Sequence, residues 1–364
     1  MNEIVKRIHD LTLHLTNTPG RRDRNHIHER ILTFNQTIVP SHCWDTLNPN
    51  CFEPLALFLR HHPDQLLGGL VGRTYWDWLE VDNLWIDESL RRQGLGRMLL
   101  TAAETEAIMR GCTHAHLKTF SFQAKCFYEA LGYRPIGQLE DCPPGEVYYW
   151  LRKDFGRHEY ISFKSVGTDT DVLDYLVQLN RNHPRRKQII VHIVDQLVQL
   201  ARRNPNVLEL CTGPGMFARY LFKQLPHTHY TGFDYSPAFV DFTQRQVSLS
   251  KSWAVVHQAD LNRDDWLKKA PDTVHAIISM QSLHDLGGES HVSRIYRLAR
   301  QLLSPGGIFI NADLTVPAGT QKPDNPGRLS ISRHLELLNI HSFEQVRCSW
   351  HEDEFACVVG FVPD

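Results

Sequence analysis

The chain has 364 residues, of which 42% are hydrophobic and 22% are charged, and its formal net charge is −2. This length is typical of two domains, each large enough to bury its own core. The near-neutral charge argues against a dedicated nucleic-acid binder, because such proteins usually carry a basic surplus.

Cysteine spacing and the first residues bear on metal, redox state and location. The cysteines are scattered, and none forms a CxxC pair. A zinc site needs close pairs, and a disulfide framework belongs to short secreted chains, so we expect reduced thiols and no metal. The start, MNEIVKRIHD, lacks the apolar run of a signal peptide, and no stretch reaches the apolar length of a membrane span. We therefore expect a cytoplasmic protein without a membrane partner.

The first half reads as a mixed series of strands and helices. Residues 10–16 alternate strictly, which predicts a half-buried strand with Leu11, Leu13 and Leu15 on one face. A helix is expected next, at 24–39. After it, the patterns predict strands at 53–61, 66–79 and 79–87, a helix at 94–110 that ends at Gly111, a strand at 114–120, a helix at 123–132, and a last strand at 146–154.

The second half has a different pattern. Periodicity fades from 154 to 171, so we place a first domain at 1–155, a linker at 156–170 and a second domain at 171–364. Apolar residues from Ile190 to Ala201 recur at helical spacing. Strand and helix patterns then alternate, which predicts a parallel sheet covered by helices, and the segment 343–362 predicts a closing antiparallel hairpin around HEDE.

The segment RRQGLGR, Arg91 to Arg97, lies between a predicted strand and a predicted helix. The first N–H groups of a helix have no intrahelical partner and carry partial positive charge. Gly94 and Gly96 allow a close approach of the backbone, and the arginines add charge. The loop therefore suits a pyrophosphate. On spacing alone, an ordinary arginine-rich helix start explains it equally well.

The strand order and this loop together resemble the GNAT acyltransferase family, whose main motif is Arg/Gln-x-x-Gly-x-Gly/Ala. Arg91, Gly94 and Gly96 fill that motif, and FYEALGY (127–133) resembles the family's second motif. The resemblance implies a mixed α/β sheet that binds acetyl-CoA or another acyl-CoA. Its pyrophosphate would lie on Arg91, Arg92, Gln93, Gly94, Leu95, Gly96 and Arg97, and its pantetheine arm along a bulged, splayed strand at Leu84, Trp85 and Ile86.

The same resemblance assigns catalytic roles. Tyr128 matches the family's general acid, although an aromatic packed on its helix is the alternative. Glu80 or Asp82 would be the base, and a solvated strand carboxylate is at least as good an interpretation of each. Ser121 stands where many relatives have an asparagine that contacts the pantetheine arm, and Gln123 is an alternative for that contact.

A second loop, ELCTGPGM (209–216), also follows a strand and precedes a helix. Cys211 occupies the first glycine position of a dinucleotide fingerprint and the third glycine is missing, which argues against NAD. The loop resembles the first motif of class I S-adenosylmethionine methyltransferases, which implies a Rossmann-like sheet. Glu209 would then hold the amino group of S-adenosylmethionine, and Cys211, Gly213 and Gly215 would form the turn around it.

Later strand ends fit the same family in order. Asp234, with Tyr235 after it, lies where ribose hydroxyls are held in this architecture. Asp260 resembles the acceptor for the adenine amino group, with Leu261 against the ring. Gln281 and His284 would face the donor or the acceptor, and His284 is a candidate base oriented by Asp285. A histidine that caps a loop is an equally good interpretation.

The leading hypothesis is a bifunctional enzyme that acylates an amine and methylates a small molecule. One alternative is a single-activity methyltransferase whose first domain binds CoA or regulates, and another is a modifier of protein or RNA. The basic cluster RNHPRRK (181–187) lacks interleaved aromatics, so a solvated turn is favoured over a nucleic-acid site. The sequence leaves a homodimer open and does not identify either acceptor.

Overall fold

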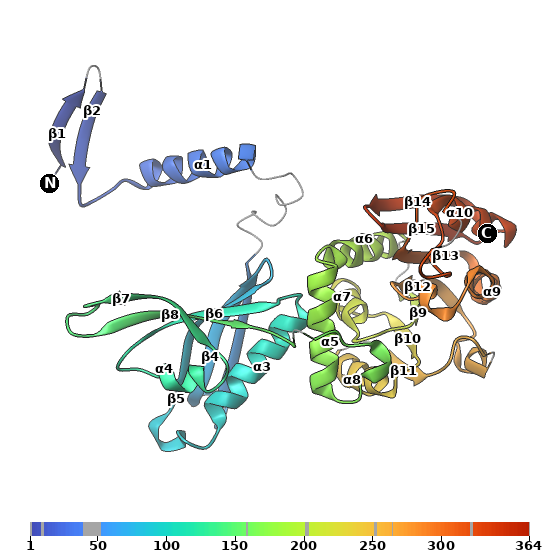
Figure 1. Cartoon of the computed structure of the whole chain (residues 1–364), viewed down its shortest axis with the longest axis horizontal. Helices are drawn as coiled ribbons and strands as arrows, with labels where there is room; N and C mark the ends of the chain where they lie inside the picture. Colours follow the sequence, from blue (N-terminus) through green and yellow to red (C-terminus); the bar gives the residue numbers. More distant parts are fainter. Residues whose placement is uncertain are drawn as a thin grey trace.

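The computed structural model describes residues 2–8, 11–38, 52–157, 159–200, 204–250, 253–263, 265–320 and 323–363. Within these ranges the strands form a two-stranded hairpin, a six-stranded sheet and a seven-stranded sheet. Figure 1 shows the two larger sheets as neighbouring units, with helices α5, α6 and α7 on the side of the second unit that faces the first. The sequence-based prediction of an α/β fold with two different sheets is confirmed.

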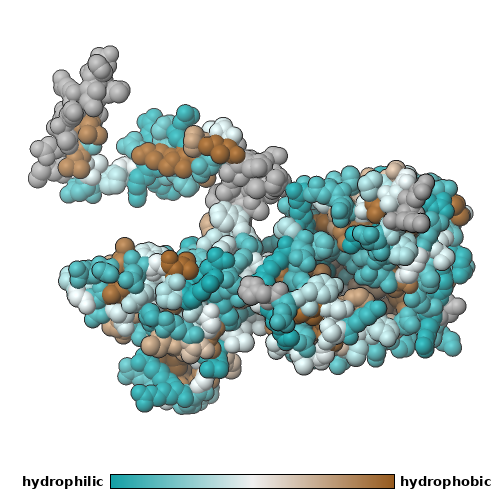
Figure 2. All heavy atoms as spheres, in the orientation of Figure 1, coloured by the Kyte–Doolittle hydropathy of each residue, from teal (hydrophilic) through white to brown (hydrophobic). Residues whose placement is uncertain are grey.

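The N-terminal segment is a hairpin followed by a helix: β1 (Asn2–Ile8), β2 (Leu11–Thr16) and α1 (Arg21–Ile38). The strand predicted at 10–16 is confirmed, but its burial is not. Leu13 and Leu15 are 55% and 62% exposed, so their alternation marks no buried face. The apolar stripe of α1 is exposed as well, as the brown surface in Figure 2 shows, at Ile27, Ile31, Phe34 and Ile38.

The six-stranded sheet has the order β3-β4-β5-β6-β8-β7, and only the β5–β6 pair is parallel. The segment 66–79, predicted as one strand, is divided by a turn at Trp76 and Asp77, where Trp76 has a positive φ of 50°. The elements are β3 (Glu53–Arg60), β4 (Leu66–Tyr75), β5 (Trp78–Ile86), η3 (Glu88–Leu90), α3 (Leu95–Met109), β6 (His114–Phe120), α4 (Lys125–Glu129), β7 (Arg134–Glu140) and β8 (Val147–Asp154).

The seven-stranded sheet has the order β11-β10-β9-β12-β13-β15-β14. Its first five strands are parallel and its last two are antiparallel, so the predicted alternation and the predicted closing hairpin are both confirmed. The strands are β9 (Asn206–Leu210), β10 (His229–Asp234), β11 (Trp253–Gln258), β12 (Val274–Met280), β13 (Leu303–Leu314), β14 (Glu344–Glu352) and β15 (Phe355–Phe361).

Helices and short 3₁₀ turns connect these strands. Because parallel strands end at one edge, the loops after β9, β10, β11, β12 and β13 gather there, where ligands bind in such folds. The connecting elements are α5 (Asp169–Asn182), α6 (Arg186–Gln199), α7 (Met216–Gln224), α8 (Pro237–Val247), η5 (Asp265–Lys269), η6 (Leu283–Leu286), α9 (Glu289–Leu302) and α10 (Ile331–Ile340).

The two units share a packed boundary. Val172, Leu176 and Val177 of α5 belong to the same buried cluster as Ile108 and Met109 at the end of α3. Burying each such side chain contributes about 1.5–3 kcal/mol. Asn180 Nδ2 on α5 also donates to the Ile108 carbonyl at 3.2 Å. The contact is therefore an extension of the first unit's core.

The segment predicted as a linker contributes to this boundary. Ile161 and Val166 are buried, and a capping box between Thr168 and Asp171 begins α5. In the ranges that the structure describes, no helix combines the length and apolarity needed to cross a bilayer. No group of three or more histidine, cysteine or acidic side chains in those ranges is arranged to hold a metal ion.

Candidate functional sites

The two glycine-bearing loops begin their helices in the same way. Gly94, with φ 81°, precedes α3, and Gly215, with φ 79°, precedes α7. Glycine adopts this left-handed conformation without the steric penalty of a side chain. Neither helix has a side-chain cap at its start. The first N–H groups of both helices are therefore free to meet a ligand.

The first loop is exposed and rich in cations. Arg91 Nε donates to the Ile86 carbonyl at 3.0 Å, and Arg91 Nη1 lies 3.4 Å from Glu88 Oε1. Arg91 therefore fastens the loop to the end of β5. Arg92 and Arg97 are exposed and form no ion pair within the described part of the chain. Those two guanidiniums remain available to an anion.

The neighbouring strands part as the sequence predicts. β5 pairs with β6 only from Trp78 to Val81, although both strands continue further. A bulge in β5, between Val81 and Asn83, accompanies the parting. It shifts the side-chain alternation, so that Leu84 and Ile86 pack on the core while Trp85 is 47% exposed. The gap leaves one backbone edge of this segment open, although the Ile86 carbonyl already binds Arg91.

Tyr128 lies on α4, in the segment 127–133 that resembles the second GNAT motif. Its ring packs on Phe127 and Tyr133, at centroid distances of 5.1 and 5.9 Å, and it is 8% exposed. No hydrogen bond to its hydroxyl occurs within the described residues. Burial raises the pKa of Tyr128 above its usual 10.0, which keeps the phenol protonated at neutral pH. A buried, protonated and unengaged hydroxyl suits a proton donor.

The two candidate carboxylates have different surroundings. Arg73 Nε donates to Glu80 Oε2 at 2.8 Å, so Glu80 is held in an ion pair. Asp82 is the extra residue of the bulge, is exposed, and has no ion-pair partner in the described ranges. Asp82 is therefore the freer group at the point where the strands part.

Ser121 is engaged within the protein. Its hydroxyl donates to Glu146 and accepts from the Val147 N–H at 2.9 Å, which ties the end of β6 to β8. Gln123 Oε1 accepts from the Phe120 N–H at 3.0 Å, and its amide nitrogen has no such bond in the described part of the chain. Of the two side chains, Ser121 is therefore the more fully engaged within the protein.

The second loop is buried and carries acids instead of cations. Glu209 is 2% exposed, accepts from the Tyr230 hydroxyl, and has its pKa raised by burial to about 8. Asp234 accepts from the Gly213 N–H at 2.8 Å and from the Ser236 N–H at 2.9 Å. Burial raises the pKa of Asp234 to about 6. These two strand ends fix the loop and surround it with acceptors.

Strained backbone gathers at the same edge of the sheet. Cys211 after β9 and Gln281 after β12 have positive φ values of 59° and 52°, and these strands are neighbours. Such conformations cost about 1–3 kcal/mol each and cluster at functional sites. The Gln281 Oε1 atom is buried without a hydrogen-bond partner. It is thus an unmet acceptor at this edge of the sheet.

His284 forms a buried dyad, but with a different carboxylate from the one expected. Its Nδ1 lies 2.5 Å from Asp313 Oδ1, and its backbone N–H donates to Asp313 Oδ2 at 3.1 Å. Asp285, the orienter expected from the sequence, lies 3.5 Å from Nε2 and is partly exposed. Burial lowers the pKa of His284, but the hydrogen bond and charge of Asp313 outweigh it and leave the pKa above 6.5.

The other residues expected at the methyl-donor site, Asp260, Tyr235 and Leu261, differ in their exposure to solvent. Asp260 accepts from the Asn262 N–H at 3.0 Å and lies 3.6 Å from Arg263 Nε, with 34% of its side chain exposed. Tyr235 is 63% exposed. Leu261 is buried in the second hydrophobic core.

Comparisons with known proteins follow the same division. A family model described as acetyltransferase (GNAT) domain matches residues 55–135. Blasticidin-S acetyltransferase of Streptomyces morookaense is 43% identical over 103 residues, which are 28% of this chain and 76% of that protein. The chain belongs to the GNAT acetyltransferase family. An acetyltransferase structure from Bacillus cereus is 31% identical and covers 39% of this chain and 97% of its own, with a TM-score of 0.35.

The seven-stranded unit beyond the GNAT domain is a methyltransferase domain. A family model described as methyltransferase domain matches residues 208–309, from β9 into β13. The carbon methyltransferase structure of CurJ is 17% identical and covers 54% of this chain and 64% of its own, with a TM-score of 0.43. The methyltransferase family model covers the Gly213–Gly215 loop, Asp234 and His284. The GNAT family model covers Arg91–Arg97.

Some residues of these sites were missed at the sequence level. Asp313 ends the predicted strand in IFINAD, so its type and place were visible, but its pairing with His284 depends on β12 and β13 being neighbours. The ion pair of Arg73 with Glu80 likewise depends on the register of β4 and β5. The sequence pattern did not show the turn at Trp76 and Asp77, and that turn fixes the register of β4 and β5.

Proposed function

We propose that the chain is a bifunctional transferase that acetylates an amine with acetyl-CoA and methylates a small molecule with S-adenosylmethionine. The pair of donor loops carries the proposal. Both begin a helix at a left-handed glycine, but one is exposed beside Arg92 and Arg97 and the other is buried beside Glu209. The first suits a pyrophosphate, and the second suits a donor with a cationic amino group.

Acetyl transfer requires a neutral amine and a proton for the departing thiolate. Acetyl-CoA would supply the acyl group, with its arm along the open edge of Leu84 and Trp85. Asp82 would accept the proton of the incoming ammonium, directly or through water. Tyr128 would donate its phenolic proton to the leaving sulfur. Glu80 would position Arg73 and shape the acceptor side.

The acceptor of this reaction is a small-molecule amine. The relative from Streptomyces morookaense is named for blasticidin S, which makes that compound the first acceptor to test. The face of the sheet that carries Glu80 is lined by polar and aromatic groups. Tyr75 and His116 are joined at 2.6 Å, and Trp78 stacks on His114 at 4.6 Å. Aromatic faces and carboxylates together attract a cationic acceptor.

Methyl transfer needs a base only when the acceptor must lose a proton. The buried dyad supplies one, because Asp313 holds Nδ1 of His284 and leaves Nε2 as the reactive nitrogen. S-adenosylmethionine would supply the methyl group, with its amino group on Glu209 and its ribose on Asp234. The remaining contribution of the protein is orientation in a water-poor pocket. We therefore infer that the methylated atom is a hydroxyl oxygen or a protonated amine nitrogen.

The test is a paired assay on one preparation. The chain is incubated with acetyl-CoA and blasticidin S, and separately with S-adenosylmethionine and a panel of hydroxyl and amine compounds, and products are followed by mass spectrometry. We expect acetylation in the first reaction and methylation in the second. Absence of turnover with every acceptor, together with no binding of either donor, would overturn the proposal.

A further inference from the structure

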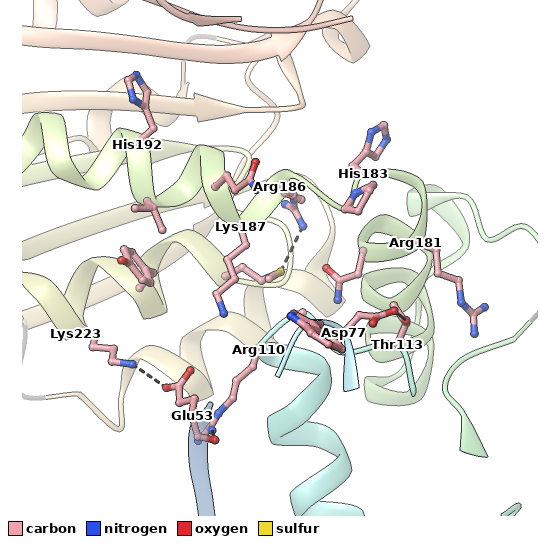
Figure 3. Close-up of a pocket in the computed structure, with 18 of the residues that line it drawn as sticks. Glu53, Asp77, Arg110, Thr113, Arg181, His183, Arg186, Lys187, His192 and Lys223 are labelled. Carbon is pink, nitrogen blue, oxygen red and sulfur yellow. Dashed lines mark hydrogen bonds and ion pairs between the residues drawn. The ribbon is translucent and has the colours of Figure 1, made fainter. Parts of the chain in front are cut away.

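A cavity of about 1230 Å³ lies between the GNAT and methyltransferase domains. Glu53, Trp76, Asp77 and Arg110 line it from the first domain, and the start of α6 and the length of α7 line it from the second. Figure 3 shows Lys187 extending into this space, with Glu53 and Lys223 beneath it and Arg110 nearby. Met216, the last residue of the 209–216 loop, lines the cavity, and no other residue of the two donor loops does.

Arg186 is the most unusual residue of its wall. Arg186 is only 7% exposed, and its Nη1 donates to the thioether sulfur of Met216 at 3.5 Å (Figure 3). Its Nε is buried with no hydrogen-bond partner, and no carboxylate within the described residues forms an ion pair with it, although the charge of Glu209 acts on it from a greater distance. A buried cation without a paired anion is costly. Arg186 is therefore not part of a solvated turn, contrary to the interpretation of RNHPRRK from sequence.

The position of the cations adds to this cost. Arg186 and Lys187 are the first residues of α6, and Arg185 is its N-cap. The helix dipole is positive at this end, so cations there are unfavourable and an anion is favourable. Arg185 is compensated by an ion pair with Glu352. Arg186 and Lys187 have no such partner in the described part of the chain.

The described acids that face the cavity form no ion pair with these two residues, although Lys187, after Lys223 and Arg110, helps to lower the pKa of Glu53. Glu53 is 2.7 Å from Lys223, on the opposite wall. Asp77 accepts from Thr113 at 3.0 Å and lies 3.2 Å from His114 Nδ1. Asp195 lies on the same helix about two turns beyond Lys187. The N-terminus of α6 therefore carries the positive charge of Arg186 and Lys187 without a paired acid among the described residues.

We propose that this interdomain cavity binds a small anionic molecule that bears a phosphate or carboxylate group. The anion would lie against Arg186 and Lys187 at the start of α6. Its other side would face Arg110 of the GNAT domain, so that both domains contribute to one site. The site adjoins the 209–216 loop at Met216 and contains no residue of the 91–97 loop.

The test is calorimetric titration of the full chain with inorganic phosphate and, separately, with citrate. CoA and S-adenosylhomocysteine are first bound to saturation, so that neither donor site can take up the anion, and their binding is recorded independently. We expect saturable binding of at least one anion, and the stronger one identifies the class of ligand. Lys187→Glu should weaken that binding at least tenfold. Lys268→Glu, at an exposed lysine of η5, is the matched control and should leave it unchanged.

Three results would overturn the proposal. The first is the absence of saturable binding of either anion to the wild-type chain. The second is equal binding by wild type and Lys187→Glu, which has an exposed side chain and should fold normally. The third is anion binding that occurs only without S-adenosylhomocysteine, because Arg186 would then serve the methyl donor.

Discussion

The two donor loops share one backbone solution and differ in almost everything around it. Each places a left-handed glycine immediately before a helix that has no side-chain cap. Around Gly94 lie exposed arginines and open space, and a side chain built there would meet nothing within 4 Å. Around Gly215 lie buried acids and a close neighbour, and a side chain built there would come within 2.7 Å of Thr243.

This difference separates two uses of the same helix start. Free N–H groups attract negative charge in both cases. The flanking side chains then decide what is held: Arg92 and Arg97 add to that attraction, whereas Asp234, and Glu209 once it ionises, offset it and favour a cationic group. A loop motif alone therefore does not define its ligand, and the charge and burial of its flanks must be read with it.

The largest expected effect is a separation of the two activities. His284→Gln should reduce methyl transfer by about 10²–10⁴-fold, because it removes the base, and leave acetylation unchanged. Tyr128→Phe should do the reverse and lower acetylation through loss of its proton donor. Steady-state rates of both reactions on the same two preparations measure this. Parallel loss of both activities in either variant would contradict independent sites.

The glycine comparison can be tested with matched substitutions. Gly94→Ala should cost about 1–2 kcal/mol of unfolding free energy from left-handed strain alone. Gly215→Ala adds a contact with Thr243, and overpacking of this kind costs about 1–3 kcal/mol more. Urea unfolding followed by circular dichroism gives both values. Equal losses would show that the space around the two glycines does not matter.

The dyad predicts a change in pH dependence. His284 must be neutral to act as a base, and Asp313 holds its pKa above 6.5, so methylation should rise with pH along a limb centred above 6.5. Asp313→Asn removes the charge that raises the pKa. The rising limb should therefore move to lower pH, with a lower plateau because the ring is less well oriented.

The control for this experiment is Asp285→Asn, which alters the carboxylate farther from the ring, at 3.5 Å from Nε2. The rate profile of that variant should move less than that of Asp313→Asn. If Asp285→Asn moves the limb further, the orienter expected from sequence is the correct one.

The smallest expected effect is a proton released on binding of S-adenosylmethionine. Burial raises the pKa of Glu209 to about 8, so the unliganded carboxyl is mostly protonated at pH 7. A cationic amino group beside it would favour the ionised form and lower that pKa. Calorimetry in buffers of different ionisation enthalpy should detect fractional proton release. Glu209→Gln should abolish it, and equal release by both chains would contradict a role for Glu209.

Sequence patterns predicted the fold more fully than the sites. The alternation from Asn206 to Leu314 and the closing hairpin follow from apolar periodicity, which reports burial directly. The exposure of Leu13 and Leu15 was not predictable, because alternation shows that a face is apolar but not what covers it. The division of 66–79 at Trp76 lacks a glycine or proline to mark it.

For the sites, residue types at strand ends were readable and their partners were not. Glu209, Asp234 and His284 lie at the edge where they were expected. The choice of Asp313 over Asp285, the ion pair of Glu80 and the bulge at Asp82 depend on strand order and register. Burial of Arg186 depends on how α6 meets α7.

The central claim is that one chain holds two different group donors in two separate loops. Native mass spectrometry of the chain with CoA and S-adenosylhomocysteine tests it most directly. The account predicts one molecule of each bound to the same chain, with Gly94→Val losing only CoA and Gly215→Val losing only S-adenosylhomocysteine. Mutual displacement of the two ligands, or loss of both in either variant, would contradict it.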